Sequence, residues 1–168
     1  NGKPGGALPG RLLWASLVKG KIEGQQMLPS GEVVLDYHPQ SKQLLTHSTV
    51  EEQGQIGGAQ VLTLWKVAPA DTVVTLVTRW RADSNEGGSP SIWGRIVDAA
   101  TVIQRWKRNE YAAWDIANKR LKYRLPQESF FVPDPTLSGG RRYLVLPEDR
   151  QVRIIESVSG SLVTTIPA

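Results

Sequence analysis

The chain has 168 residues, a formal net charge of +4 and no cysteine. This length allows one domain with a sizeable core, and a composition of 40% hydrophobic and 21% charged residues excludes wholesale disorder. The absence of cysteine excludes disulfides, thiolate metal ligands and a cysteine nucleophile. No apolar run reaches the length of a membrane span and no signal-peptide core is visible. We therefore expect a soluble protein without a membrane partner, and we favour the cytoplasm.

The positive charge does not predict a nucleic-acid partner. A nucleic-acid footprint needs basic residues gathered on one face. The basic residues fall instead into two small clusters, Arg105, Lys107 and Arg108 in one and Lys119, Arg120, Lys122 and Arg124 in the other. The residues of the second cluster alternate with apolar residues, which is typical of a strand with one solvent-exposed face.

The first 32 residues divide into two parts. Residues 1–10 are rich in Gly and Pro, which indicates a linker or tail. Residues 11–32 are interpreted as an incomplete preceding blade or an irregular unit. Within them, residues 12–18 fit a strand or a short helical turn, because periodicity does not separate the two in so short a run. Residues 22–28 fit an outer strand.

Residues 33–80 form the first of three blade-like repeats. Four alternating runs predict strands over residues 33–39, 43–48, 60–67 and 72–77. Between the second and third strands, residues 51–59 contain three glycines and few apolar side chains. This composition predicts an extended hairpin loop.

Two further repeats follow at residues 91–126 and 130–168, after a polar, glycine-bearing segment from 81 to 90. Turn signals every 8 to 12 residues between short β-prone runs predict an all-β fold. The expected strands are residues 91–97, 101–106, 110–116 and 120–125, then 130–135, 143–146, 151–155 and 162–166. A helix over 98–117 is the competing interpretation. It is rejected because Trp106, Tyr111 and Trp114 fit an alternating pattern.

Three stretches of the chain share one sequence pattern, a short alternating run that ends in a polar turn. When they are laid on one another, Trp65, Trp114 and Ile155 coincide, with spacings of 49 and 41 residues. Self-similarity near this period is typical of the four-stranded blades of a β-propeller. An aromatic residue at a repeated strand position fills the space between sheets, so we expect these side chains to be packing residues.

At these positions the chain resembles the WD-repeat family of β-propellers, in a divergent bacterial style. Trp65-Lys66 and Trp114-Asp115 stand where the signature Trp-Asp lies, and Ile155-Glu156 is a degenerate third copy. Tyr37-His38-Pro39 is similar to the aromatic-Ser-Pro that closes the first strand of such a repeat. The resemblance covers residues 33–168. It implies a non-catalytic scaffold whose rim loops dock a protein partner.

The number of repeats leaves the ring incomplete. Propellers close with roughly 4 to 8 blades, and this chain holds about three. Open ends expose blade faces and a strand edge, which invites pairing with another chain. The chain is therefore a piece of a longer propeller, or closes a ring with copies of itself or a partner, or uses residues 1–32 as an irregular fourth unit. We favour the first reading, which the missing Met also suggests.

The expected binding residues lie in the two polar loop segments, because no catalytic constellation is visible and the binding surfaces of repeat proteins lie in loop insertions. They are Glu51, Glu52, Arg81, Asp83 and Glu86. The four less regular tryptophans offer a second possibility, since one of them at a rim can stack on a sugar, base or proline. They are Trp14, Trp80, Trp93 and Trp106.

An enzyme or sensor is the alternative function, with a small ligand or metal held in the central channel. Its polar contributors would be Asp36, His38 and His47, as metal ligands or a general base. The plainer interpretation is that His38, at a strand end, serves its turn. A calcium site at residues 83–86 is not favoured, because the regular odd spacing of oxygen ligands is missing. We expect no cofactor.

Overall fold

The computed structural model describes residues 9–16, 19–50, 59–68, 73–81, 93–107, 109–127 and 133–168. All regular elements in these ranges are β-strands, which form one two-stranded and three four-stranded sheets. The two-stranded sheet pairs β1 (Pro9–Ser16) with β2 (Lys21–Ser30). The first four-stranded sheet contains β3 (Val33–His38), β4 (Gln43–Val50), β5 (Ala59–Ala68) and β6 (Val73–Arg81). Among the described residues no helix has the length and apolarity to cross a bilayer.

The second sheet contains β7 (Gly94–Ile96), β8 (Thr101–Lys107), β9 (Glu110–Asp115) and β10 (Arg120–Pro126). The third contains β11 (Thr136–Leu137), β12 (Tyr143–Pro147), β13 (Gln151–Glu156) and β14 (Leu162–Pro167). All neighbouring strands are antiparallel and follow chain order. The predicted all-β fold of four-stranded antiparallel sheets is confirmed.

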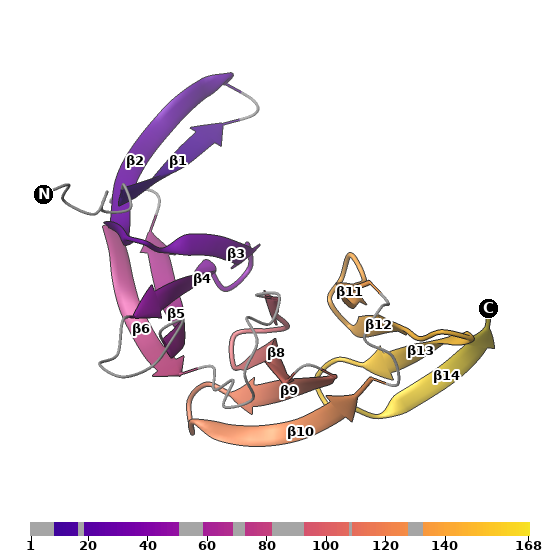
Figure 1. Cartoon of the computed structure of the whole chain (residues 1–168). Helices are drawn as coiled ribbons and strands as arrows, with labels where there is room; N and C mark the ends of the chain where they lie inside the picture. The colour runs from indigo at the N-terminus through magenta and orange to yellow at the C-terminus, as the bar shows by residue number, and fades with distance from the viewer. Residues whose placement is uncertain are drawn as a thin grey trace, which may run out of the picture.

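The sheets succeed one another along an arc (Figure 1). The inner strands β3 and β11 lie on the concave side of the arc, and the outer strands β6, β10 and β14 lie on its convex side. Each sheet therefore presents one broad face to the sheet before it and the other to the sheet after it. This arrangement places the cores between sheets.

Apolar side chains fill the spaces between successive sheets. Leu45, Leu62 and Leu64 of the first sheet pack against Val102 and neighbouring residues of the second. A second cluster joins the second sheet to the third through Ile103, Tyr111, Leu144, Leu146 and Ile155. Burying each such side chain contributes about 1.5–3 kcal/mol. Successive sheets are thus held together by apolar contacts between their faces.

The hairpin β1–β2 covers the other face of the first sheet. Leu28 is buried with Leu44 and Val67, and Leu12 and Trp65 pack against them. The strand interpretation of residues 12–18 is therefore correct as far as Ser16, and β2 spans the predicted strand at 22–28. β1 begins at Pro9, inside the stretch expected to be a linker.

The innermost strand of the third sheet differs from the prediction. It is Thr136–Leu137, not residues 130–135. Residues 133–135 lie outside any strand, and residues 128–132 lie outside the described part of the chain. Pro133 and Pro135 have no N–H to donate to a ladder, which explains why pairing starts only after them.

The three sheets share one irregularity between their third and fourth strands. The register of each strand pair shifts by one residue beside Trp65, Trp114 and Ile155 respectively. The residue left unpaired on the outer strand is Val77, Lys122 or Val163. Such bulges bend the strand and increase its twist.

A hydrogen bond repeats at the same place in each sheet. The N–H two residues after the bulge position donates to a carbonyl at the turn between the first and second strands. The three donor–acceptor pairs are Val67 to Lys42 at 2.8 Å, Ile116 to Ala100 at 2.8 Å, and Ser157 to Arg142 at 2.9 Å. The described sheets are therefore repeats in backbone geometry as well as in strand order.

Candidate functional site

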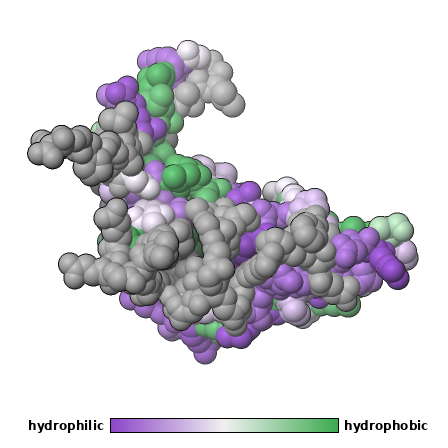
Figure 2. Space-filling view, in the orientation of Figure 1, coloured by the Kyte–Doolittle hydropathy of each residue, from purple (hydrophilic) through white to green (hydrophobic). Residues whose placement is uncertain are grey.

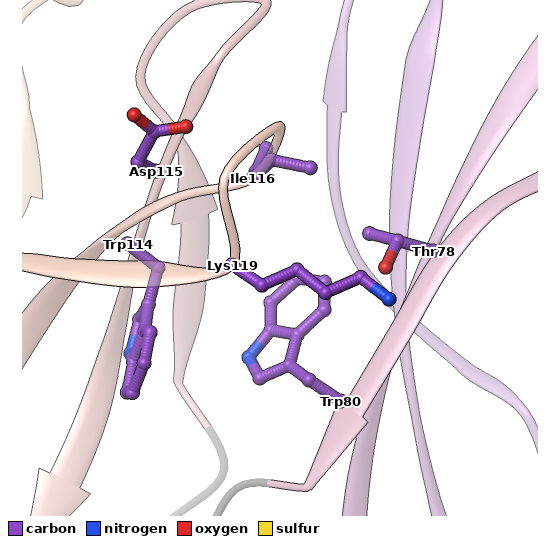
Figure 3. A pocket seen from close by; sticks show the side chains of 6 residues that line it. All are labelled: Thr78, Trp80, Trp114, Asp115, Ile116 and Lys119. Atoms are coloured by element: carbon purple, nitrogen blue, oxygen red, sulfur yellow. The ribbon is translucent and has the colours of Figure 1, made fainter.

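An open groove lies between the outer strand of the first sheet and the β9–β10 turn of the second. We call it the tryptophan groove; its volume is about 110 Å³ and its lining residues are Thr78, Trp80, Trp114, Asp115, Ile116 and Lys119. Figure 3 shows the two indoles standing beside each other, with the Lys119 chain passing across Trp80 toward Thr78. The lining is mostly apolar.

Each indole is held by the strands behind it. Trp80 lies near the end of β6, and its Nε1 donates to Gln104 Oε1 of β8 at 2.7 Å. Trp114 lies on β9 beside the shared bulge, and its ring packs on that of Trp106 with centroids 5.1 Å apart. The groove walls are thus fixed before any ligand arrives, which lowers the entropic cost of binding.

The mouth of the groove carries one carboxylate, that of Asp115, and one ammonium group, that of Lys119. Asp115 is occupied by its own turn, because its carboxylate accepts from Asn118 N at 3.0 Å and from Asn118 Nδ2 at 2.9 Å. These hydrogen bonds hold the pKa of Asp115 below its usual value. Lys119 has a positive φ of 51° and makes no hydrogen bond or ion pair within the described residues. Its ammonium group is therefore available to a ligand.

A second hollow lies among the inner strands, and we call it the inner-strand pocket. Its volume is about 280 Å³ and its lining is Asp36, Arg95, Pro135, Thr136, Leu137, Ser138, Gly139 and Arg141. Residues from β3, β7 and β11 meet there, on the concave side of the arc (Figure 1). It corresponds in position to the predicted central channel.

The charged groups of the inner-strand pocket already have hydrogen-bond partners within the protein. Arg141 donates to both oxygens of Asp36, at 2.5 and 3.0 Å, and to the carbonyl oxygens of Tyr37 and Ile96. Asp36 also accepts from Ile96 N at 2.8 Å. Arg95 donates to the carbonyl oxygens of Leu35 and Gly94. A ligand would have to displace these bonds.

His38 serves the β3–β4 turn beside this pocket. Its Nδ1 accepts from the Ser41 N–H at 3.1 Å and lies 2.8 Å from Ser41 Oγ. The side chain is buried, and desolvation together with the nearby Arg141 lowers the pKa of the imidazole. The ring is therefore a neutral structural acceptor.

The three residues named for a channel metal do not come together. His47 lies opposite Val33, at the other end of the β3–β4 pair from His38, which lies opposite Gln43. The two histidines are nine residues apart on different strands of the hairpin. His38 stands next to the turn and His47 stands at the far end of the strand pair, so the two residues are separated along the strands. No group of three or more His, Asp or Glu residues suited to a metal occurs in the described ranges.

The predicted loop residues have little structural description. Glu51, Glu52, Asp83 and Glu86 lie outside the described residues, and Arg81 is the last residue of β6, paired through its backbone with Val61. The predicted repeat positions are described. Trp65 donates from Nε1 to Thr46 Oγ1 at 2.8 Å, Ile155 is 2% exposed, and Trp114 and Asp115 line the tryptophan groove.

Sequence reasoning named Trp80 only as one of four irregular tryptophans, and it did not name Thr78, Ile116 or Lys119 as site residues. The sequence signal for Trp80 was the two-residue period of a β-strand. Trp80 comes two residues after Thr78, so the two side chains lie on the same face of an outer strand. No pattern in the sequence links this strand to a turn about 40 residues later. The groove exists only because successive sheets pack face to face.

Comparison with known proteins identifies the fold. No family model matches the chain, and no curated protein matches it. Among solved structures, BamB from Moraxella catarrhalis aligns with a TM-score of 0.54 at 13% identity, over 88% of this chain and 41% of BamB. Hsv2 from Kluyveromyces marxianus aligns with a TM-score of 0.51 at 13% identity, over 81% of this chain and 40% of Hsv2.

Hsv2 from Kluyveromyces lactis, with its complete loop 6CD, aligns with a TM-score of 0.50 at 15% identity, over 81% of this chain and 37% of that structure. BamB and Hsv2 are β-propellers. This chain spans about two-fifths of their length. Its fold is that of successive β-propeller blades.

Proposed function

We propose that this chain is part of a non-catalytic protein-interaction scaffold, a propeller of WD-repeat type, and that the tryptophan groove binds a side chain of a partner protein. The observation that carries the proposal is the groove itself, with two fixed indoles and an available cation at its mouth. Tryptophan is enriched at the energetic centres of protein interfaces. The β-propeller fold commonly mediates such interactions.

The size of the groove favours a protein partner over a small molecule. Small-molecule sites enclose about 300–1,000 Å³, whereas the groove encloses about 110 Å³. A space of this size suits one anchoring side chain, such as leucine, isoleucine or proline, from a larger partner. The larger inner-strand pocket is a weaker candidate, because its Asp36 and Arg141 neutralise each other.

The ammonium group at the groove mouth favours one type of residue beside the anchoring side chain in the partner's sequence. Lys119 favours an acidic residue next to the apolar side chain in the partner, since opposite charges improve specificity and association rate. We propose that the acidic residues of the two predicted loop segments, Glu51, Glu52, Asp83 and Glu86, contact basic residues of the same partner, and that Arg81 contacts an acidic one. Asp83 and Glu86 follow closely after Trp80 in the chain.

A selection from a phage-displayed library of random linear peptides tests this proposal. Clones that bind the whole chain should share an apolar residue beside Asp or Glu. Their affinity should fall at least tenfold for Trp80→Ala. The variant Lys119→Glu should weaken the same clones, because it places like charges together.

Lys42→Glu is the matched control. Lys42 is also an exposed turn lysine with a positive φ, 52° against 51° for Lys119, but it does not line the groove. It should leave peptide affinity unchanged. The proposal is wrong if the folded protein selects no peptides, or if the selected peptides bind the Trp80→Ala variant as tightly as the wild type.

A further inference from the structure

The outer strand of the first sheet has an open edge beside the tryptophan groove. Among the described residues, β6 pairs with β5 and with no other strand. Thr78 and Trp80, which line the groove, lie on this strand. The second sheet packs on the face of the first and not on its edge. Further blades at either end of the chain would also pack on sheet faces, so they would leave this edge open.

Strand register shows which backbone groups β6 directs outward. The Val67 N–H donates to the Lys42 carbonyl beside β4, so the backbone groups of Val67 point away from β6. Successive residues of a strand direct their N–H and C=O groups to opposite sides. Lys66 therefore faces β6, and its partner Thr75 faces back. The backbone groups of Leu76, the next residue of β6, point outward.

The same alternation continues past the bulge residue Val77. Leu64 lies two residues before Lys66 on β5, so it also faces β6, opposite Thr78. Thr78 faces back toward β5, and the backbone groups of Arg79 after it point outward. The edge thus offers N–H and C=O groups on both sides of the bulge. Such an edge is a template for an added strand.

The side chains of β6 do not protect this edge. Residues 73–78 include no charged side chain, and Leu76 and Val77 are 53% and 46% exposed. The outer strand of the second sheet, β10, instead carries three exposed basic residues, Arg120, Lys122 and Arg124. Figure 2 shows that the convex side of the molecule at β10 is mostly hydrophilic. Charged side chains on an edge oppose strand addition, so β6 is the more receptive of the two.

A strand added to β6 would project a side chain into the tryptophan groove. Thr78 and Trp80 point to the face of the first sheet where the β9–β10 turn forms the other wall. Arg79 between them points to the opposite face. Side chains of paired strands lie beside those directly opposite. A residue added next to Trp80 would therefore project toward Trp114 and Lys119.

The charges around this edge favour an acidic segment. β6 itself contains no Asp or Glu. Arg79, which pairs with Glu32, still has 49% of its side chain exposed on one face of the strand. Lys119 lies across Trp80 on the other face (Figure 3). An acidic residue on either face of an added strand would thus meet a cation, and opposite charges improve specificity and association rate.

We propose that the partner segment binds as an extended strand added to β6 between Leu76 and Arg81, with its apolar anchor in the tryptophan groove and an acidic residue beside that anchor. This inference rests on the proposed function, because it describes how the same partner is held. In such complexes main-chain hydrogen bonds supply affinity and pockets for alternate side chains supply specificity. A helix could fill the groove but not pair with the edge, because its backbone groups bond within the helix.

An N-methyl scan of a peptide selected on the whole chain tests this mode of binding. Replacing one backbone N–H at a time by N–CH3 removes a donor and leaves every side chain in place. In an added strand every second residue donates to β6, so methylation at those residues should weaken binding about tenfold. Methylation of the intervening residues, whose N–H groups point to solvent, should leave the affinity nearly unchanged.

Leu76→Pro tests the edge of the protein. Proline at this position removes an outward N–H and leaves the β5–β6 ladder intact, as it does on other edge strands. The variant should weaken the same peptides about tenfold and keep its β-sheet circular dichroism. Leu76→Ala is the matched control, because it shortens the same side chain but retains the N–H. It should bind like the wild type.

The outcomes separate this inference from the proposed function. If no peptide is selected, both fail. Peptides that require Trp80 but lose affinity equally, or not at all, at every methylated position would remove the added strand alone. A folded Leu76→Pro variant that binds as tightly as the wild type would also overturn it. The N-methyl scan uses the unaltered protein, so it decides the question even where that variant does not fold.

Discussion

Single polar side chains at turns decide how the strands of each sheet begin and end. His38 is one of them, because its Nδ1 accepts the Ser41 N–H that the β3–β4 turn would otherwise leave unpaired. Ser41 Oγ in turn donates to Gln43 Oε1 at 2.7 Å, and Gln43 Nε2 donates to the Ala99 carbonyl of the second sheet at 3.1 Å. The neutral imidazole therefore supports both a turn and a contact between sheets.

This role predicts a pH-dependent stability. Burial and Arg141 lower the pKa of His38 below its ordinary value of 6.5 in the folded chain. As the pH falls below about 6.5, the unfolded chain takes up a proton that the folded chain resists, so the free energy of unfolding decreases. Urea unfolding at pH 5 to 8 should show this loss, and it should flatten in His38→Gln. An unchanged pH profile in that variant would contradict the prediction.

At the scale of elements, the sequence predicts strands well where polar and apolar residues alternate. The last three strands of the second sheet follow their predicted ranges closely, because Trp106, Tyr111 and Trp114 fit an alternating pattern. Its first strand is only Gly94–Ile96, shorter than the predicted 91–97. The predicted position of β11 was wrong because a strand of two residues is too short to show an alternating pattern. The prolines before it also interrupt that pattern. The repeat of Trp65 and Trp114 marked Trp114 as a repeated strand position, but as a packing residue and not as a wall of the groove. Trp80 and Lys119 depend on contacts between sheets, which no local pattern encodes.

The β13–β14 turn gives a testable case of one element shaped by another. Gly160 has a φ of +76°, and a Cβ there would lie 2.5 Å from Cγ of Tyr123, which comes from β10 of the second sheet. The Tyr123 hydroxyl donates to the Ser157 carbonyl, so the ring has little freedom to move away. Gly160→Ala should lower the free energy of unfolding by about 2–4 kcal/mol, from backbone strain and overpacking together.

Gly31→Ala separates these two causes. Gly31 has a similar φ of +82°, and nothing lies within 4 Å of its Cβ position. That variant should cost only the backbone strain, about 1 kcal/mol. Equal losses in the two variants, measured by urea unfolding, would show that Tyr123 does not constrain the turn.

On the scale of the whole molecule, the apolar clusters between sheets join neighbouring sheets, as in other repeat architectures. The ion pair between Asp36 and Arg141 is different, because it connects the first sheet to the third across an interval of 105 residues. The same guanidinium reaches the Ile96 carbonyl of the second sheet. The side chains of Asp36 and Arg141 are 12% and 19% exposed, respectively, so water screens the ion pair only weakly.

Removing this pair should therefore lower cooperativity as well as stability. In a double-mutant cycle, Asp36→Asn and Arg141→Met should show a coupling energy of about 1–3 kcal/mol. The pair Glu110 and Arg124, at 3.9 Å with Arg124 50% exposed, is the control and should couple by less than about 1 kcal/mol.

Native-state hydrogen exchange distinguishes a link between distant sheets from a merely local bond. If Arg141 ties the third sheet to the first, Asp36→Asn should let the amides of β12 and β13 exchange through an opening that leaves β4 and β5 protected. A local bond would instead raise exchange only beside the substituted residue. Uniform acceleration of all four strands would show that the sheets unfold together without this pair, and it would contradict the prediction.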